Sequence, residues 1–432
     1  MFTRFSRAVA LCAVLFVSAP LFAQAQPITA GDMMRHIEVL ASDEYGGRAP
    51  ATEGERRTTA YIVAELEKRG LEPAATNGGW LQAVPLIERR TMAHDMRWST
   101  RGRVIAFDVE RVVLIGDEDE HRIFEAPVVF VGHGAVDRAR GIDQLAGADL
   151  QGAVALMLVA SPDVPGFPSF EERMRAVAAA GAAVVIGVLP DEVPWQAVVN
   201  ASRAPTTELA THPRPRVSGA IPLAEVVRIV RESGGDFMSM LNERAGPAFR
   251  AVPLNLNASF TVNSRVRRYT SNNVVGRIRG SAPRRADRPN ESVLLLGHWD
   301  HLGTCGREGD QDRICNGAVD NASGIAMLIE IAGRIAAGPP AARDVLVLAT
   351  TAEEMGLLGA EHFAAQPPVP LEGIVAALNF DTVAIHGTGQ PVAVIGRGFA
   401  PLDGAIAATA AEFRRSMDTT YAADAFIRRQ DG

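Results

Sequence analysis

The chain has 432 residues, of which 47% are hydrophobic and 22% are charged, and its formal net charge is -7. This composition is that of a globular protein with room for two domains. An acidic chain has no electrostatic reason to bind nucleic acid, so nucleic acid is excluded as an expected partner.

The first 25 residues have the pattern of an export signal. Arg4 and Arg7 form a basic start, residues 8–16 are apolar, and residues 23–25 read Ala-Gln-Ala, a typical cleavage site. The alternative is a membrane anchor, but the apolar run is short for a membrane span. We therefore predict a periplasmic or secreted protein with no stable membrane anchor after cleavage. Cleavage would remove two positive charges and no acidic residue, so the mature charge would be -7 - 2 = -9.

Two cysteines remain beyond this leader, Cys305 and Cys315, and both lie in one loop. Two thiolates without further cysteines would hold zinc poorly, and an exported protein folds in an oxidising compartment. The sequence therefore favours a local disulfide between them over a metal site.

The mature chain begins with a helix–turn–helix pattern over residues 31–71, and the second helix runs from residue 53 to Gly70. A strand is predicted at residues 84–86. The segment between the helices, residues 40–50, reads Leu-Ala-Ser-Asp-Glu-Tyr-Gly-Gly-Arg-Ala-Pro.

The pattern changes between residues 91 and 268. Short apolar runs at residues 128–134, 153–158 and 183–188 predict strands, and residues 171–180 predict an Ala-rich helix. With the turn at residues 146–152, this region resembles a protease-associated (PA) domain, and the alternative is a generic β-rich insertion. No internal repeat or low-complexity tract is evident.

Strand and helix patterns alternate from residue 270 onward. Strands are predicted at residues 292–297, 344–350 and 374–380, and helices at residues 323–337 and 359–365. Near-continuous apolar strands between helices predict an α/β fold in which helices sandwich a mostly parallel mixed sheet. Side chains that follow such strands gather at the carboxyl edge of the sheet.

Histidine and carboxylate residues follow these strands. The segments are Gly-His-Trp-Asp at 297–300, Asn-Gly-Ala-Val-Asp-Asn-Ala-Ser-Gly at 316–324, Ala-Glu-Glu-Met-Gly at 352–356 and Leu-Asn-Phe-Asp at 378–381. Taken singly, each has an ordinary structural explanation: a core histidine, a helix N-cap, a solvated acidic pair. Taken together, imidazole and carboxylates suit zinc, although manganese or cobalt binds the same ligand types.

The order and the amino-acid sequences of these segments, together with residues 40–50, resemble those of peptidase family M28. The zinc aminopeptidases of this family have a zinc-exopeptidase-like fold. The resemblance implies a discontinuous peptidase domain at residues 26–90 and 269–432, after the signal at residues 1–25, with the PA-like insertion at residues 91–268. It implies peptide substrates and two zinc ions. The oligomeric state is not predicted.

The resemblance also assigns roles to individual residues. His298, Asp320, Glu354 and Asp381 would be metal ligands, with Asp320 bridging the two ions, and Asp300 would orient His298. Glu353 would be the general base that takes a proton from metal-activated water.

The family pattern has a second histidine ligand near the C-terminus, and aligning residues 430–432 with it places Gly432 at that position. The sequence is either truncated or lacks that ligand, so one zinc is expected to be weak or absent. His301, His362 and His386 are candidate substitutes, and the sequence does not choose among them.

The leading interpretation is an exported metal-dependent aminopeptidase that removes N-terminal residues from peptides. One alternative is an M28-like carboxypeptidase, and another is a catalytically silent relative that binds through its PA-like domain. A glutaminyl-cyclase-like acyltransferase fits the Glu353-Glu354 pair and the insertion less well.

Overall fold

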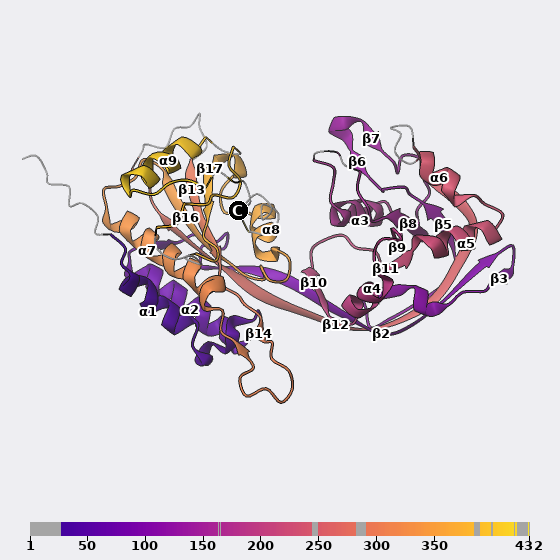
Figure 1. The fold of residues 1–432 in the computed structure, drawn as a ribbon, viewed down its shortest axis with the longest axis horizontal. Helices are drawn as coiled ribbons and strands as arrows, with labels where there is room; N and C mark the ends of the chain where they lie inside the picture. Colours follow the sequence, from indigo (N-terminus) through magenta and orange to yellow (C-terminus); the bar gives the residue numbers. More distant parts are fainter. Residues whose placement is uncertain are drawn as a thin grey trace, which may run out of the picture.

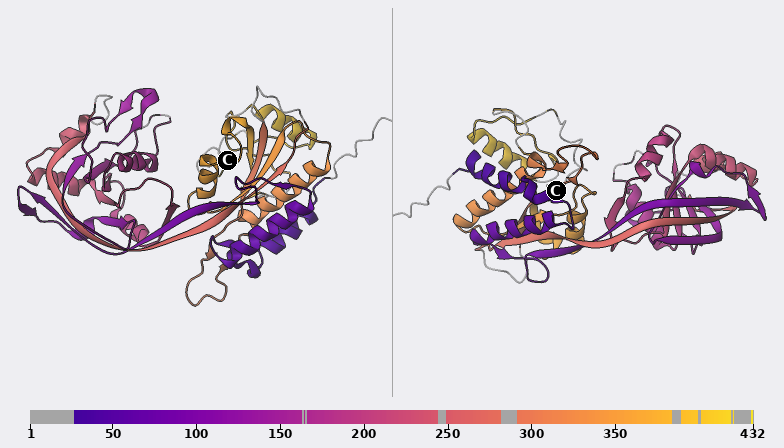
Figure 2. Two further views of the ribbon diagram at one scale, coloured as in Figure 1. Left: turned by 180° about the vertical axis from the view of Figure 1, so that it is seen from behind. Right: turned by 90° about the horizontal axis from the view of Figure 1, so that it is seen from below.

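The computed structural model describes residues 27–162, 164, 166–243, 249–281, 291–383, 389–398, 401–418, 420 and 431. The predicted export signal therefore lies outside the described residues. Figure 1 shows two lobes joined by two long paired strands, β2 (Leu81–Thr100) and β12 (Val252–Ile278). These antiparallel strands stay in register from Leu81 opposite Val274 to Ser99 opposite Asn257, with one shift near Asn263. Figure 2 shows from two further directions how the pair curves from one lobe to the other.

The terminal lobe contains both ends of the described chain. Its sheet has the strand order β17–β13–β16–β12, in which the first three strands are parallel and β12 is antiparallel to β16. The α/β class with a mixed sheet is thus confirmed. The elements of this lobe are α1 (Ala30–Leu40), α2 (Glu53–Lys68), β1 (Glu72–Pro73), β13 (Ser292–His298), β14 (Gly303–Thr304), β15 (Ile314–Cys315), α7 (Gly324–Ala337), β16 (Asp344–Thr350), α8 (Leu358–Ala365), β17 (Ile374–Asn379) and α9 (Asp403–Glu412).

The central strands of this lobe are buried on both faces because their side chains alternate between two apolar layers. Leu295 and Val347 pack with α1, α2 and α7 on one face. Leu294, Leu296 and Leu348 pack with α8 on the other face. This explains why the strands read as continuous apolar runs in the sequence.

The N-terminal helices are fixed by caps and by a buried polar network. Thr29 caps α1 in a capping box with Asp32, and Thr52 caps α2. Inside, the carboxylate of Glu330 on α7 lies 3.0 Å from Nε2 of His36 and also pairs with Arg69. The three helices are therefore joined by charge as well as by apolar packing.

The middle lobe continues the same sheet in the order β12–β5–β8–β9–β11–β4, with β5, β8, β9 and β11 parallel. Its apolar core is separate from that of the terminal lobe. Its elements are β3 (Arg103–Ile105), β4 (Val113–Gly116), β5 (Glu120–Phe130), β6 (Val136–Asp137), β7 (Ile142–Asp143), β8 (Val154–Leu158), α3 (Phe170–Ala179), β9 (Val184–Leu189), α4 (Trp195–Ser202), β10 (Thr206–Leu209), β11 (Val217–Pro222), α5 (Leu223–Glu232) and α6 (Phe237–Glu243).

The predicted domain boundaries, 90/91 and 268/269, both fall inside uninterrupted strands, β2 and β12. The assignment of the middle lobe to a PA-like domain stays a prediction. A second link between the lobes is the ion pair of Arg175 on α3 with Glu361 on α8, at 2.7 Å. Among the helices described here, none combines the length and the apolar character that a bilayer crossing requires.

Candidate metal centre

The candidate site lies at the carboxyl edge of the three parallel strands. β13 ends at His298, which lies opposite Thr350 at the end of β16. Glu353 and Glu354 follow β16 in the next turn, and Asp381 comes two residues after the end of β17. Parallel strands place their carboxyl ends at one edge, so residues separated by more than 80 positions in the sequence meet there.

His298 is the centre of a first cluster. Its Nε2 atom lies 3.2 Å from Oδ1 of Asp320, 3.5 Å from Oδ1 of Asp381 and 3.9 Å from Oε2 of Glu353. The ring is 1% exposed, so these oxygens replace water around it. The structure thus brings together the imidazole and three of the carboxylates singled out in the sequence.

A second cluster lies beside the first. Nδ1 of His301 is 2.5 Å from Oε1 of Glu354, and one ligand atom from each of His301, Asp320 and Glu354 lies within 4.8 Å of the others. The consecutive side chains of Glu353 and Glu354 therefore lie in different clusters. Asp320 is close to both.

Asp300 orients the site in a different way from the prediction. Nδ1 of His298 hydrogen-bonds to the main-chain oxygen of Asp300 at 3.2 Å, whereas the nearer carboxylate oxygen is 3.8 Å away. That carboxylate instead accepts a hydrogen bond from the main-chain N–H of Glu353 at 3.1 Å. Asp300 thus holds the imidazole with its backbone and the Glu353 turn with its side chain.

The acidic groups perturb one another strongly. Burial, together with nearby carboxylates, raises the pKa of Glu353 to about 8 and that of the fully buried Asp300 to about 7. Burial opposes charge on His298, but Asp320 and Asp381 outweigh it and raise the pKa of the ring to about 11. In the opposite direction, the contact with His298 lowers the pKa of Asp320. This concentration of negative charge favours a cation.

The residues present fit a divalent metal. Oδ1 of Asp320 is shielded from solvent, and its contact with Nε2 of His298 at 3.2 Å does not meet hydrogen-bond geometry. A buried carboxylate oxygen without a well-aligned donor is costly unless a cation binds it. Imidazole nitrogen and carboxylate oxygen are zinc ligand types, and His298, Asp320 and Asp381 supply three of them.

Two residues outside the predicted ligand set hold the loops in place. The first is Arg48, whose side chain is buried and which is 1% exposed. It ends the Gly-Gly-Arg turn within residues 40–50, to which the sequence assigned no role. Its guanidinium donates to four main-chain carbonyl oxygens, those of Leu40, Trp299, Asn316 and Gly317, at 2.7, 2.9, 2.6 and 2.8 Å. Burial lowers the pKa of Arg48 to about 10, while nearby Asp300 and Asp320 oppose that shift.

Asn321 is the second such residue. Its side-chain amide donates to the carbonyl oxygens of His298 and Phe380 and accepts from the N–H groups of Gly324 and Thr382. It therefore joins the ends of β13 and β17 to the start of α7. An amide directly before a predicted helix, in the Asp-Asn-Ala-Ser-Gly segment, was the sequence signal that could have identified it.

The histidine candidates have different outcomes. His301 joins the second cluster, whereas His362 is buried in α8 and belongs to neither cluster of described residues. His386 and Gly432, the position aligned with the family's second histidine, lie outside the described residues. Next to Gly432, Asp431 accepts a hydrogen bond from Thr350.

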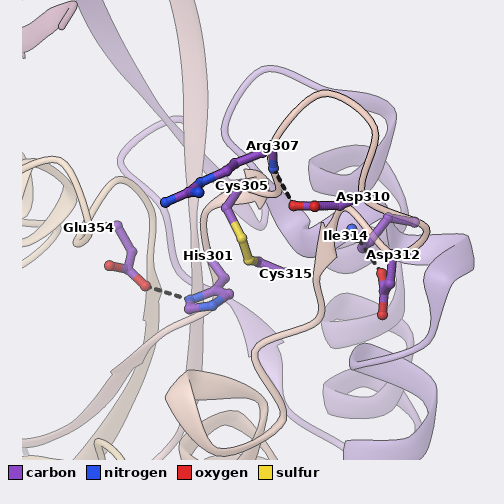
Figure 3. Close-up of a disulfide and its surroundings, with 8 residues drawn as sticks. All are labelled: His301, Cys305, Arg307, Asp310, Asp312, Ile314, Cys315 and Glu354. Carbon is purple, nitrogen blue, oxygen red and sulfur yellow. Dashed lines mark hydrogen bonds and ion pairs between the residues drawn. A yellow bond between two sulfur atoms is a disulfide. The ribbon is translucent and has the colours of Figure 1, made fainter.

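Cys305 and Cys315 form a disulfide that closes the loop between the clusters' ligands. Figure 3 shows this disulfide beside the facing side chains of His301 and Glu354. The adjoining strands β14 and β15 pair through Gly303 opposite Cys315. We call β14, β15 and the segment between them, residues 303–315, the cysteine ribbon.

Part of this chain is similar to a known protein family. Residues 273–431 match the family model described as Peptidase family M28. Among curated proteins, a probable glutamate carboxypeptidase, AMP1, from Arabidopsis thaliana is 28% identical over 253 residues. The match covers 56% of this chain and 32% of that protein, so the chain spans about a third of its relative's length.

Two solved structures illustrate the overall likeness. An aminopeptidase from Aneurinibacillus sp. strain AM-1 has a TM-score of 0.41 at 19% identity, with 85% of this chain and 74% of that chain covered. A peptidase M28 precursor from Shewanella amazonensis SB2B has a TM-score of 0.39 at 16% identity, with 93% and 85% covered. The family assignment depends on the sequence match, which includes His298, Asp320, Glu353, Glu354 and Asp381. Residues 273–431 of this chain, which carry the candidate metal ligands, are therefore similar to peptidase family M28.

Proposed function

We propose that this protein is a zinc-dependent aminopeptidase that removes N-terminal residues from peptides. The observation that carries the proposal is the first cluster, in which one buried imidazole nitrogen lies within 3.9 Å of oxygens from three carboxylates. His298, Asp320 and Asp381 would hold the ion. Zinc, when bound, supplies a Lewis acid that polarises the scissile carbonyl and makes water nucleophilic near neutral pH.

The protein's own residues would manage the proton. Glu353 is fixed by the hydrogen bond from its N–H to Asp300 and lies at the edge of the cluster. Burial raises its pKa to about 8, so this carboxylate binds a proton more readily than a solvated glutamate does. Glu353 would take a proton from water and return it to the departing amine.

The test is hydrolysis of leucine p-nitroanilide by the zinc-loaded protein. We expect activity that a chelator abolishes, and a fall in kcat of about 10²–10⁴-fold in Glu353→Gln at unchanged zinc content. Glu372→Gln is the matched control, because Glu372 is exposed in the same lobe. Full activity of Glu353→Gln would contradict the proposed base. A folded, zinc-loaded protein without any hydrolysis would favour the binding relative.

A carboxypeptidase is the second candidate, favoured by the name of the Arabidopsis thaliana relative. The same site chemistry can cleave either end of a peptide, because metal and base act on the scissile bond itself. A blocked dipeptide such as N-acetyl-aspartyl-glutamate distinguishes the two activities. Its cleavage, without cleavage of leucine p-nitroanilide, would replace the aminopeptidase proposal.

We also propose that the protein acts outside the cytoplasm. The basic and apolar pattern of residues 1–25 and the disulfide between Cys305 and Cys315 support this. The test is cell fractionation with N-terminal sequencing, for which we expect a mature chain that begins at Gln26. An unprocessed cytoplasmic chain would contradict export.

A further inference from the structure

We infer that His301 is a metal ligand, and that it forms a second cation site with Asp320 and Glu354 that the cysteine ribbon holds in shape. The inference rests on the proposed function in one respect, because Asp320 is shared with the first site. His301 was one of three histidines among which the sequence could not choose. Of the two that lie among the described residues, His301 and His362, His301 is the one that joins a carboxylate cluster.

The potential ligand atoms of the three residues are close together. Ligand atoms of His301, Asp320 and Glu354 lie within 4.8 Å of one another, and all three residues are partly buried. The side chains of His301 and Glu354 are 14% and 20% exposed, and their Nδ1 and Oε1 atoms face each other at 2.5 Å. One imidazole and two carboxylates form a ligand set that suits zinc.

The backbone at Gly317 leaves space for the His301 ring. Gly317 has a φ of 57°, and a Cβ atom there would lie 2.7 Å from Cδ2 of His301 and 2.5 Å from Nη2 of Arg48. A side chain at position 317 would therefore displace the ring or the guanidinium. The absence of a side chain at Gly317 lets the imidazole lie against the Asp320 segment.

A disulfide lies in the chain segment that connects His301 with Asp320. His301 comes two residues before the cysteine ribbon, and Asp320 comes five residues after Cys315. The disulfide thus closes the loop whose two ends carry these ligands. It fixes their separation in the unliganded protein, so less order has to be created when a metal binds.

The ribbon is itself anchored to the body of the lobe. Gly47, in the turn before Arg48, lies against it so closely that a Cβ atom would be 2.4 Å from the oxygen of Gly303 and 2.6 Å from that of Cys315. Arg48 holds the carbonyl oxygens of Asn316 and Gly317 directly after the ribbon. The ribbon therefore has two attachments that orient both of its ends.

The experiment measures zinc per chain by elemental analysis and each binding step by competition with a chromophoric chelator. We expect two zinc ions in the wild type and one in His301→Asn, with the lost step weakened about 100-fold or more. His298→Asn should lose the other step. The control is His121→Asn, since Nε2 of His121 pairs with Asp117 at 2.7 Å in the middle lobe at similar burial.

A double variant, Cys305→Ser with Cys315→Ser, tests the ribbon. We expect zinc affinity at the His301 site to weaken about 10–100-fold, which is the usual effect of losing a group that orients metal ligands. Zinc affinity at the His298 site should not change. Circular dichroism checks that each variant is folded. The inference would be overturned if folded His301→Asn still bound two zinc ions per chain. It would also be overturned if the wild type bound one zinc ion per chain and His301→Asn bound the same amount. Failure of the proposed function differs, since zinc would bind in both steps without peptide hydrolysis.

Discussion

Replacing Arg48 tests whether one buried guanidinium shapes the metal centre. In Arg48→Ala, four main-chain carbonyl oxygens lose their donor. Each buried acceptor left unsatisfied costs about 1–3 kcal/mol. We use the lower end because water can enter the vacated space, and we expect the free energy of unfolding to fall by about 4 kcal/mol. Arg48→Lys should recover only part of the lost free energy of unfolding, because an ammonium group cannot reproduce the planar arrangement of guanidinium donors.

Stability alone would not show a role in the site, so zinc affinity is measured alongside urea unfolding. The matched control is Arg173→Ala, because Arg173 is also 1% exposed and also donates to main-chain carbonyl oxygens, including those of His133 and Leu158, but in the middle lobe. Both variants should lose stability, and only Arg48→Ala should lose zinc affinity, by about 10–100-fold. Equal zinc affinity in folded Arg48→Ala and the wild type would refute the reasoning.

Two further predictions concern the terminal lobe. Glu330→Gln should lower the free energy of unfolding by about 3 kcal/mol at pH 7, because His36 and Arg69 lose their buried carboxylate. Burial opposes the charge of Glu330, yet His36 and Arg69 keep its pKa below the ordinary 4.5. The stabilisation by Glu330 is therefore fully present above pH 4.5 and is lost as the pH falls through the lowered pKa. A constant difference in the free energy of unfolding between wild type and variant from pH 7 to pH 3 would count against this. Gly359→Ala should destabilise the protein by several kcal/mol, because the added Cβ would lie 2.3 Å from the main-chain oxygen of Thr351. Gly404→Ala, in a helix with open space around it, should be neutral or should stabilise by about 0.5–1 kcal/mol. Midpoints of urea unfolding compare the two variants.

The sequence was most informative where apolar periodicity was strong. β16 spans Asp344–Thr350, the range that its apolar run predicted, and α1, α2, α7 and α8 begin and end within a few residues of their predicted positions. The meeting of His298, Glu353 and Asp381 followed from the same reasoning, since parallel strands end at one edge. These features depend on local pattern and on one general rule of topology.

The long strands could not be foreseen in the same way. A short strand was predicted at residues 84–86, yet β2 continues to Thr100 through Glu88, Arg89 and Arg90. These polar residues remain in the sheet because their main-chain groups pair with β12 and β10, and Arg89 pairs with Glu208. Ladder bonds are independent of side-chain polarity, so period-two hydrophobicity does not reveal such a strand.

The role of His301 was hidden for a related reason. Its direction depends on the cysteine ribbon, on the absence of a side chain at Gly317 and on Arg48, which lies more than 250 positions earlier in the chain. No local pattern encodes a contact made by three distant segments. The role of a histidine next to a metal-binding motif therefore cannot be predicted until the conformation of its loop is known.

The acidic groups of the site suggest why ligand binding and folding are coupled there. Asp300, Glu353 and Asp431 all have a raised pKa, because burial and neighbouring carboxylates oppose their ionisation. A fold gains nothing from placing such groups together, and an apolar edge would pack at lower cost. A divalent cation removes that repulsion and satisfies oxygens such as Oδ1 of Asp320. The stability of this edge of the sheet therefore depends on what the site binds.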